Sequence, residues 1–161
     1  MDWSALYTMQ EHLDTYIEAQ HNLSDRDLFR EKYLALLVEL GELANETRCF
    51  KFWSTKPKNE QSVILEEYVD GIHFILSLGL EKGYRFDARE VEPANTNVTG
   101  QFTLVYSDCV AFYQEPGEAA YKQLFVRFIQ LGKLLGFDET AVMTAYLKKN
   151  DINYERQNQG Y

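Results

Sequence analysis

The sequence predicts an all-α protein, because helix-breaking residues are few and apolar residues follow a helical period. Only 3 prolines and 9 glycines occur among the 161 residues, and residues that favour helices, such as leucine and glutamate, are frequent. Apolar residues recur every three or four positions along most of the chain, as they do on one face of a helix. We therefore expect a bundle of about five to six helices with a four-helix core.

The first helix is expected from Asp2 to about Gln20. Its apolar positions follow one another at spacings of three, four and four residues: Leu6, Met9, Leu13 and Ile17. This spacing places them on one side of the helix, and Gln20 extends that side by a further turn.

A second helix is expected over residues 25–48, after a turn at 22–25 that offers N-cap side chains. Its apolar residues point almost all the way round when they are placed at 100° per residue: Tyr33, Leu34, Leu36, Leu37, Val38, Leu40 and Leu43. We therefore expect this helix to be buried on most of its sides.

A third helix is expected from Ser62 to about Lys82, with Gly83 as its C-terminal cap. Residues 84–117 are expected to be a loop or inserted region, because they contain Pro93 and several turn residues. A fourth helix is expected inside this region, over residues 101–114.

The last two helices are expected over residues 118–135 and from an N-cap at Asp138. Gly136 separates them. The final helix is expected to fray into a polar tail from Asn150 onward.

Length and charge limit the classes of function. A chain of 161 residues with 45% hydrophobic residues is expected to form one domain, residues 1–161. Its net charge of −9 argues against general binding to nucleic acid. Two cysteines, no secretion signal and no apolar run long enough to span a membrane lead us to expect a cytoplasmic protein without a membrane partner.

Acidic residues form a pattern on two of the predicted helices. Glu39, Glu42 and Glu46 are spaced by three and four residues, and Glu67 and Asp70 repeat the spacing on the next helix, with Glu66 beside them. Two facing carboxylate pairs would suit a hard divalent cation such as Mg²⁺. Ordinary surface acids or salt bridges to Lys or Arg would give the same pattern.

The pair Asp70-x-x-His73 also suggests a di-iron site. Such a site needs a Glu-x-x-His motif from each of two helices, and this sequence offers half of one. We expect His73 to be a core or supporting histidine instead.

The acidic motifs resemble those of a known family. Glu39-x-x-Glu42 followed by Glu67-x-x-Asp70 is similar to the signature of the all-α dimeric dUTPases, within the MazG-like NTP pyrophosphohydrolases. The segment 70–80 and the aromatic-lysine stretch 50–53 also resemble this family. The C-terminal pattern shares the likeness, with Lys149, Asn150, Asn153, Arg156, Gln157, Gly160 and Tyr161.

The resemblance implies a MazG-like helical bundle and hydrolysis of dUTP to dUMP and pyrophosphate, which keeps uracil out of DNA. It also implies that Glu39, Glu42, Glu67 and Asp70 hold Mg²⁺, two or more ions per site. Metal ions would neutralise the triphosphate and activate a water, so an acidic protein could act on an anionic substrate. Either Glu42 or Glu39 is expected to accept the proton of that water, while Glu46 and Glu66 are either supporting residues or surface acids.

The tail, residues 148–161, is expected to close over the substrate. In the family, residues of this tail contact the phosphates and the base, which assigns substrate binding to Lys149, Asn150, Asn153 and Arg156. Lys51 in the aromatic-lysine stretch is a further candidate.

Recognition of the base requires a donor next to an acceptor, which the amide of Asn or Gln provides. Gln20 and Asn150 are the candidates for this contact. Trp53 and Phe74 are candidates to flank the base or the deoxyribose, although large aromatic residues are more often part of a core.

Other functions remain open from the sequence. The chain could hydrolyse another or modified dNTP, or it could be a catalytically silent helical protein that binds a regulatory partner. Some phage-borne members of the family bind regulatory proteins, and nothing in this sequence marks such a partner. A homodimer is expected from the resemblance and from the 14% aromatic content.

Overall fold

The computed structural model describes residues 1–87 and 90–160. Within these residues it contains six α-helices and no strand, which confirms the predicted fold class. The helices are α1 (Trp3–Gln20), α2 (Phe29–Thr47), α3 (Gln61–Lys82), α4 (Val98–Gln114), α5 (Glu118–Leu134) and α6 (Glu139–Asn158).

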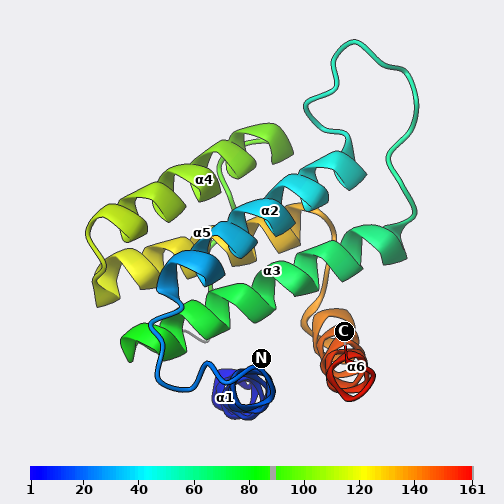
Figure 1. The fold of residues 1–161 in the computed structure, drawn as a ribbon. Coiled ribbons are helices and arrows are strands. Elements are labelled where there is room, and N and C mark those ends of the chain that lie inside the picture. Colours follow the sequence, from blue (N-terminus) through cyan, green and yellow to red (C-terminus); the bar gives the residue numbers. More distant parts are fainter. Residues whose placement is uncertain (88–89, 161) are drawn as a thin grey trace.

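Four of the helices form the core of the molecule. Helix α2 packs against α3 and α4, and α5 packs against α4 and α3. Each of the four helices α2 to α5 therefore contacts two others of the group (Figure 1). Helices α1 and α6 contact each other and α3. In Figure 1 they are seen nearly end-on below the other four, and α3 is the core helix that contacts both of them.

The predicted helix ends are largely confirmed. The side chains of Asp2 and Asp138 accept hydrogen bonds from the backbone of α1 and α6, as N-cap residues do. Gly83 ends α3 with a φ of 72°, a left-handed conformation that glycine adopts without steric cost.

Close packing between α3 and α5 depends on two glycines. A Cβ atom at Gly71 would lie 2.6 Å from the ring of Phe128, and one at Gly132 would lie 2.3 Å from the hydroxyl of Tyr68. Because Tyr68 and Phe128 stack at 4.6 Å between the two helices, both glycines let the aromatic rings lie against the backbone. This contact fixes the position of Asp70, which adjoins Gly71.

Helix α2 differs from its prediction in two respects. It begins at Phe29 instead of residue 25, because its first N–H groups are bonded by the carboxylates of Asp27 and Glu81. It is also not buried on most sides, since Leu34 and Val38 are 61% and 49% exposed. An apolar residue at these positions therefore faces solvent in the single chain.

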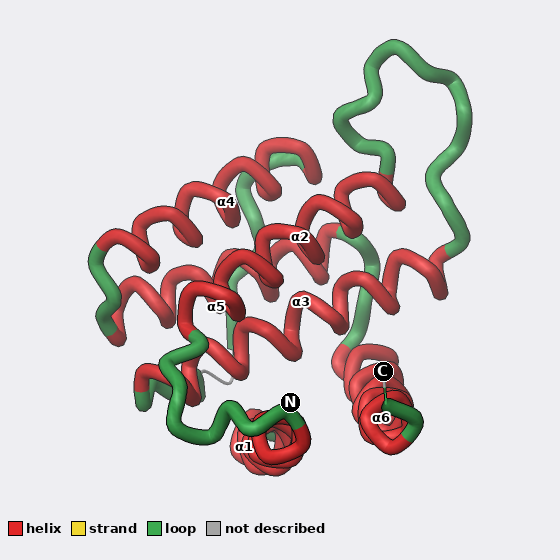
Figure 2. Tube along the Cα trace, viewed as in Figure 1, coloured by secondary structure: helices red, strands yellow, loops and turns green. Residues whose placement is uncertain are grey.

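The C-terminal half confirms one prediction and corrects another. The helix expected over residues 101–114 is present as α4, which begins three residues earlier, at Val98, and is part of the four-helix core. The tail does not fray at Asn150, since α6 continues to Asn158. Figure 2 shows the loop that joins α2 to α3 extending away from the helices.

The last turns of α6 are held by α1. Tyr16 donates a hydrogen bond to Asn158 at 2.5 Å and packs against the ring of Tyr154 at 5.2 Å. Tyr161, which belongs to the C-terminal motif, lies outside the described residues. No helix in the described ranges is both long enough and apolar enough to cross a bilayer.

Candidate metal and nucleotide site

Three of the predicted acidic residues converge between α2 and α3. Glu39, Glu67 and Asp70 each offer one carboxylate oxygen, and these oxygens lie within 4.8 Å of one another. All three side chains are partly buried. The residues that the helical spacing grouped on each helix therefore come together in space, because α2 and α3 pack side by side.

Glu42 lies beside this cluster and is exposed. Its negative charge raises the pKa of both Glu39 and Glu67, so it is an electrostatic neighbour of the group. The four carboxylates thus face one region, with Glu42 on its solvent side.

The cluster carries more negative charge than its surroundings neutralise. Burial, and then the neighbouring carboxylates, raises the pKa of Glu39 from 4.5 to about 7. Burial and the charges of Asp70 and Glu42 raise the pKa of Glu67 to about 7 as well. Desolvation of the carboxylates and the repulsion between them both favour the protonated form, and a bound divalent cation would remove the repulsion.

Helix α6 brings positive charge to the cluster. The ammonium group of Lys149 lies 2.6 Å from Asp70 and 3.1 Å from Glu66, and its side chain is only 9% exposed. The charge of Arg156 also acts on Asp70, since it lowers the pKa of that carboxyl against the effect of burial. Because α6 continues past Asn150, Lys149 and Arg156 are held by a helix rather than by a loose tail.

The two remaining acids have different surroundings. Glu66 pairs with Lys149 at the edge of the cluster. Glu46 accepts a hydrogen bond from the side chain of Asn59 at 2.6 Å, which ties the end of α2 to the loop before α3. Glu66 is therefore a neighbour of the site, whereas Glu46 anchors a loop.

The structure does not support Gln20 as a base-binding residue. Gln20 is exposed in the last turn of α1, while Gln10, about 15 Å earlier along the same helix, is only 3% exposed. Gln10 bonds to Asp14, His73 and Tyr146. Sequence reasoning missed Gln10, although a polar residue directly after Met9 on the apolar side of α1 was a usable signal.

Two buried polar atoms near the cluster have no hydrogen-bond partner among the described residues. They are Nε2 of His73 and Oδ1 of Asn150. His73 is one turn from Asp70 on α3, and Asn150 follows Lys149 on α6. Since buried polar groups are nearly always bonded, these atoms are suited to meet a ligand.

The remaining predicted site residues differ in where they lie, since two are on helices and two are in the α2–α3 loop. Phe74 is partly buried one turn after Asp70, and Asn153 is partly buried on α6. Lys51 and Trp53 lie in the loop between α2 and α3, where Trp53 is 65% exposed and contacts Phe50 and Phe52. This loop extends beyond the helix ends (Figure 1), so a single chain does not bring Lys51 and Trp53 to the cluster.

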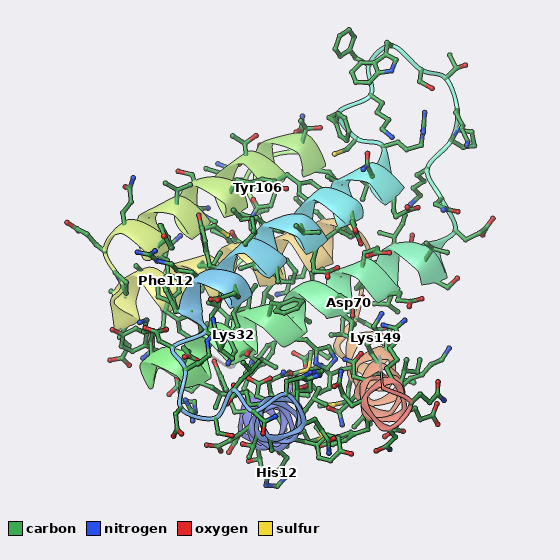
Figure 3. All side chains as sticks on the ribbon, viewed as in Figure 1. His12, Lys32, Asp70, Tyr106, Phe112 and Lys149 are labelled. Atoms are coloured by element: carbon green, nitrogen blue, oxygen red, sulfur yellow. The ribbon has the colours of Figure 1, made fainter. Side chains whose placement is uncertain are left out.

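Figure 3 shows Asp70 on α3 facing Lys149 on α6, with Lys32 farther along the molecule near α1.

In a comparison with models of known families, the chain matches the model described as dUTPase over residues 2–161. A comparison with curated proteins gave no match.

Proposed function

Because the chain belongs to the all-α dimeric dUTPase family and is therefore a hydrolase of the acid anhydride bonds of dUTP, we propose that it converts dUTP to dUMP and pyrophosphate with Mg²⁺. The observation that carries this proposal is the convergence of carboxylates from α2 and α3 in a chain that matches the family along almost its whole length. Removal of dUTP would keep uracil out of DNA.

Glu39, Glu67 and Asp70 fit a divalent cation on the chemistry of their donor set. Their oxygens are close enough to share one small region, and carboxylate oxygen is a preferred ligand of Mg²⁺. With Glu42 they would hold Mg²⁺, which would lower the pKa of a bound water and neutralise the triphosphate. Two or more ions per site are part of the proposal.

We assign Glu42 as the residue that accepts the proton of the attacking water, with Glu39 as the alternative. Glu42 lies outside the tight group of three oxygens and is exposed, so it can reach a water at the edge of the cluster. Glu39 lies within that group and is better placed as a metal ligand.

The cations of α6 are assigned to the phosphates. Lys149 is bound to Asp70, and a divalent cation on Asp70 would compete with that ion pair and leave the ammonium for a phosphate oxygen. Arg156 could bind phosphate through two parallel hydrogen bonds. Asn150 and Phe74 are assigned to binding of the nucleoside. Asn153, which is one turn from Asn150 on α6, is assigned to substrate binding as well. Lys51 and Trp53 are assigned to substrate contacts that require the α2–α3 loop to approach the site.

The test is release of pyrophosphate from dUTP, dCTP, dTTP and dATP by the purified protein with Mg²⁺. We expect release from dUTP alone, and its loss with EDTA and in Glu42→Gln. Glu46→Gln is the matched control, since Glu46 lies one turn farther on the same helix and binds Asn59. Release from another nucleotide would contradict the proposal that dUTP is the substrate. Full activity of Glu42→Gln would contradict the assignment of Glu42 to the active site.

We also propose that the active form is a homodimer. Leu34 and Val38 on α2 are exposed, as are Val110 and Tyr113 on α4. Since α2 and α4 are neighbours and Tyr33 stacks on Tyr113 at 4.3 Å, these residues form an apolar face that a second copy could cover. Light scattering should give twice the mass of the chain, and Val38→Lys should give a monomer. A wild-type monomer would contradict this part.

A further inference from the structure

Lys149 on α6 pairs with two acids of α3 that differ in their surroundings. Its ammonium group is 2.6 Å from Asp70 and 3.1 Å from Glu66, and residues four apart lie on the same side of a helix. The side chain of Asp70 is 15% exposed, whereas that of Glu66 is 56% exposed. The ammonium therefore has one partner inside the carboxylate cluster and a second partner at its edge, toward solvent.

A groove between α3 and α6 lies next to the outer of these two partners. Its volume is about 530 Å³, and Glu66 and Lys149 both line it. Its walls are largely apolar, with Leu65, Val69 and Ala145 among them. The groove provides open space beside Glu66, and lysine carries its ammonium on a flexible stem of four carbons. The end of the Lys149 side chain can therefore turn away from Asp70 and toward Glu66.

Lys149 loses its inner partner if Asp70 becomes a metal ligand. A divalent cation and an ammonium group at one carboxylate repel each other. The side chain of Lys149 is only 9% exposed, so water is a poor replacement, and a buried charge without a partner is strongly destabilising. Among the described residues, Glu66 is the other carboxylate paired with this ammonium. Its negative charge therefore matters more in the metal-bound protein than in the metal-free one.

We propose that Glu66 is a positioning residue that holds Lys149 on the groove side of α3 when Asp70 binds a divalent cation. The inference rests on the proposed magnesium site. Glu66 contacts neither the metal nor the nucleotide in this arrangement, since it acts through Lys149. Loss of Glu66 should therefore weaken binding of Mg²⁺ strongly only while Lys149 is present.

A double-mutant cycle tests this dependence on Lys149. The affinity for Mg²⁺ is measured by titration calorimetry on the full-length protein without nucleotide, in the wild type, Glu66→Gln, Lys149→Met and the double variant. We expect Glu66→Gln to weaken binding about tenfold in the wild-type background and less than about twofold in Lys149→Met. A lost metal ligand, or a general loss of negative charge, would weaken binding equally in both backgrounds. Equal weakening, or unchanged affinity in Glu66→Gln, overturns the proposal.

Glu155→Gln is the matched control for charge, because it also removes one exposed acid, on α6. It should change the affinity for Mg²⁺ less than about twofold. Weakening as large as in Glu66→Gln would overturn a specific role of Glu66. Circular dichroism establishes that each variant is folded, and Lys149→Gln replaces Lys149→Met if the latter does not fold.

The position of Lys149 is measured by ¹H–¹⁵N spectra of the lysine ammonium groups. The signal of Lys149 is assigned by its loss in Lys149→Met. In the metal-free protein we expect this signal both in the wild type and in Glu66→Gln, since Asp70 still binds the ammonium and slows its exchange with water. With saturating Mg²⁺ the signal should remain in the wild type and disappear in Glu66→Gln. Its retention in Glu66→Gln, or its loss in the wild type, overturns the proposal.

The same measurements distinguish failure of this inference from failure of the proposed function. A wild type that binds no Mg²⁺ would contradict the proposed metal site, and the role of Glu66 with it. A wild type that binds Mg²⁺ without coupling between Glu66 and Lys149 would overturn the role of Glu66 alone.

Discussion

Two groups of carboxylates in this molecule each contain one lysine, and they differ in how far that lysine neutralises them. Lys32 contacts Asp14, Glu18 and Glu81 at 3.6, 3.0 and 2.7 Å. Lys149 contacts Asp70 and Glu66, whereas Glu39 and Glu67 form no ion pair within the described residues. Figure 3 places the two lysines at different positions along α3.

The difference separates a structural cluster from one prepared for a cation. In the Lys32 cluster every carboxylate contacts the ammonium, so the group joins α1, α2 and α3 without added metal. In the Lys149 cluster burial, and then the neighbouring carboxylates, raise the pKa of Glu39 and of Glu67 to about 7, and neither of these two carboxylates forms an ion pair among the described residues. Residual charge, and not the number of acids, therefore distinguishes the candidate metal site.

The largest expected effect comes from the same change made in each cluster on α3. Glu67→Gln should lower kcat for dUTP by about 1000-fold, because it removes a metal ligand. Glu81→Gln should lower kcat less than about tenfold, because its carboxylate binds Lys32 and the start of α2. Steady-state kinetics with dUTP compare the two, and equal losses would erase the distinction between the clusters.

Removing either lysine should lower the free energy of unfolding, but Mg²⁺ should reverse the loss in only one of the two clusters. Lys32→Met should lower the free energy of unfolding by about 3 kcal/mol, since it leaves buried carboxylates without a cation, and Mg²⁺ should not restore it. Lys149→Met should also be less stable in EDTA, but Mg²⁺ should restore it by replacing the lost charge. Urea denaturation with and without Mg²⁺ measures both; rescue of Lys32→Met would show that its cluster also takes metal.

Binding of Mg²⁺ should stabilise the wild type through the Glu39 cluster alone. At a concentration 100 times Kd the gain is about 2.7 kcal/mol, which a thermal melt detects. The gain should be retained in Glu81→Gln and absent in Glu67→Gln. Equal stabilisation of both variants would mean that the ion binds elsewhere.

The smallest effect is a dependence of stability on pH in EDTA. Because the folded pKa of Glu39 and Glu67 lies near 7, above the ordinary 4.5, the folded state binds these protons more tightly than the unfolded state. The resulting stability is present at low pH and is lost as pH rises through about 7. The effect is on the order of 1 kcal/mol for groups this exposed.

Melting temperatures between pH 5 and 8 should therefore fall more steeply in the wild type than in Glu39→Gln. Glu18→Gln in the Lys32 cluster is the matched control and should keep the wild-type slope. An identical slope in Glu39→Gln would mean that this carboxyl does not titrate near pH 7.

Local patterns explain what could be predicted from the sequence. Glu39, Glu42, Glu67 and Asp70 were predictable as a group because a spacing of three places two residues on one side of a helix. The helix caps at Asp2, Asp138 and Gly83 were also predictable, because a cap depends only on residues a few positions away in the sequence. These features required no knowledge of how the helices pack.

Long-range pairings explain what could not be predicted. Gln10 meets His73 and Tyr146 across 63 and 136 residues, and Lys32 meets Glu81 across 49, distances in sequence that no helical period encodes. The continuation of α6 past Asn150 depends in the same way on Tyr16 of α1. Exposure of Leu34 and Val38 was missed because periodicity does not tell which apolar side meets the core.

The most direct test of the account is the binding of Mn²⁺, as a spectroscopic substitute for Mg²⁺, measured by electron paramagnetic resonance without nucleotide. The wild type and Glu81→Gln should bind the ion with similar affinity, and Glu67→Gln should lose most of that binding. Equal binding by Glu67→Gln and the wild type, or loss of binding in Glu81→Gln alone, would contradict the assignment of the Glu39, Glu67 and Asp70 cluster as the metal site.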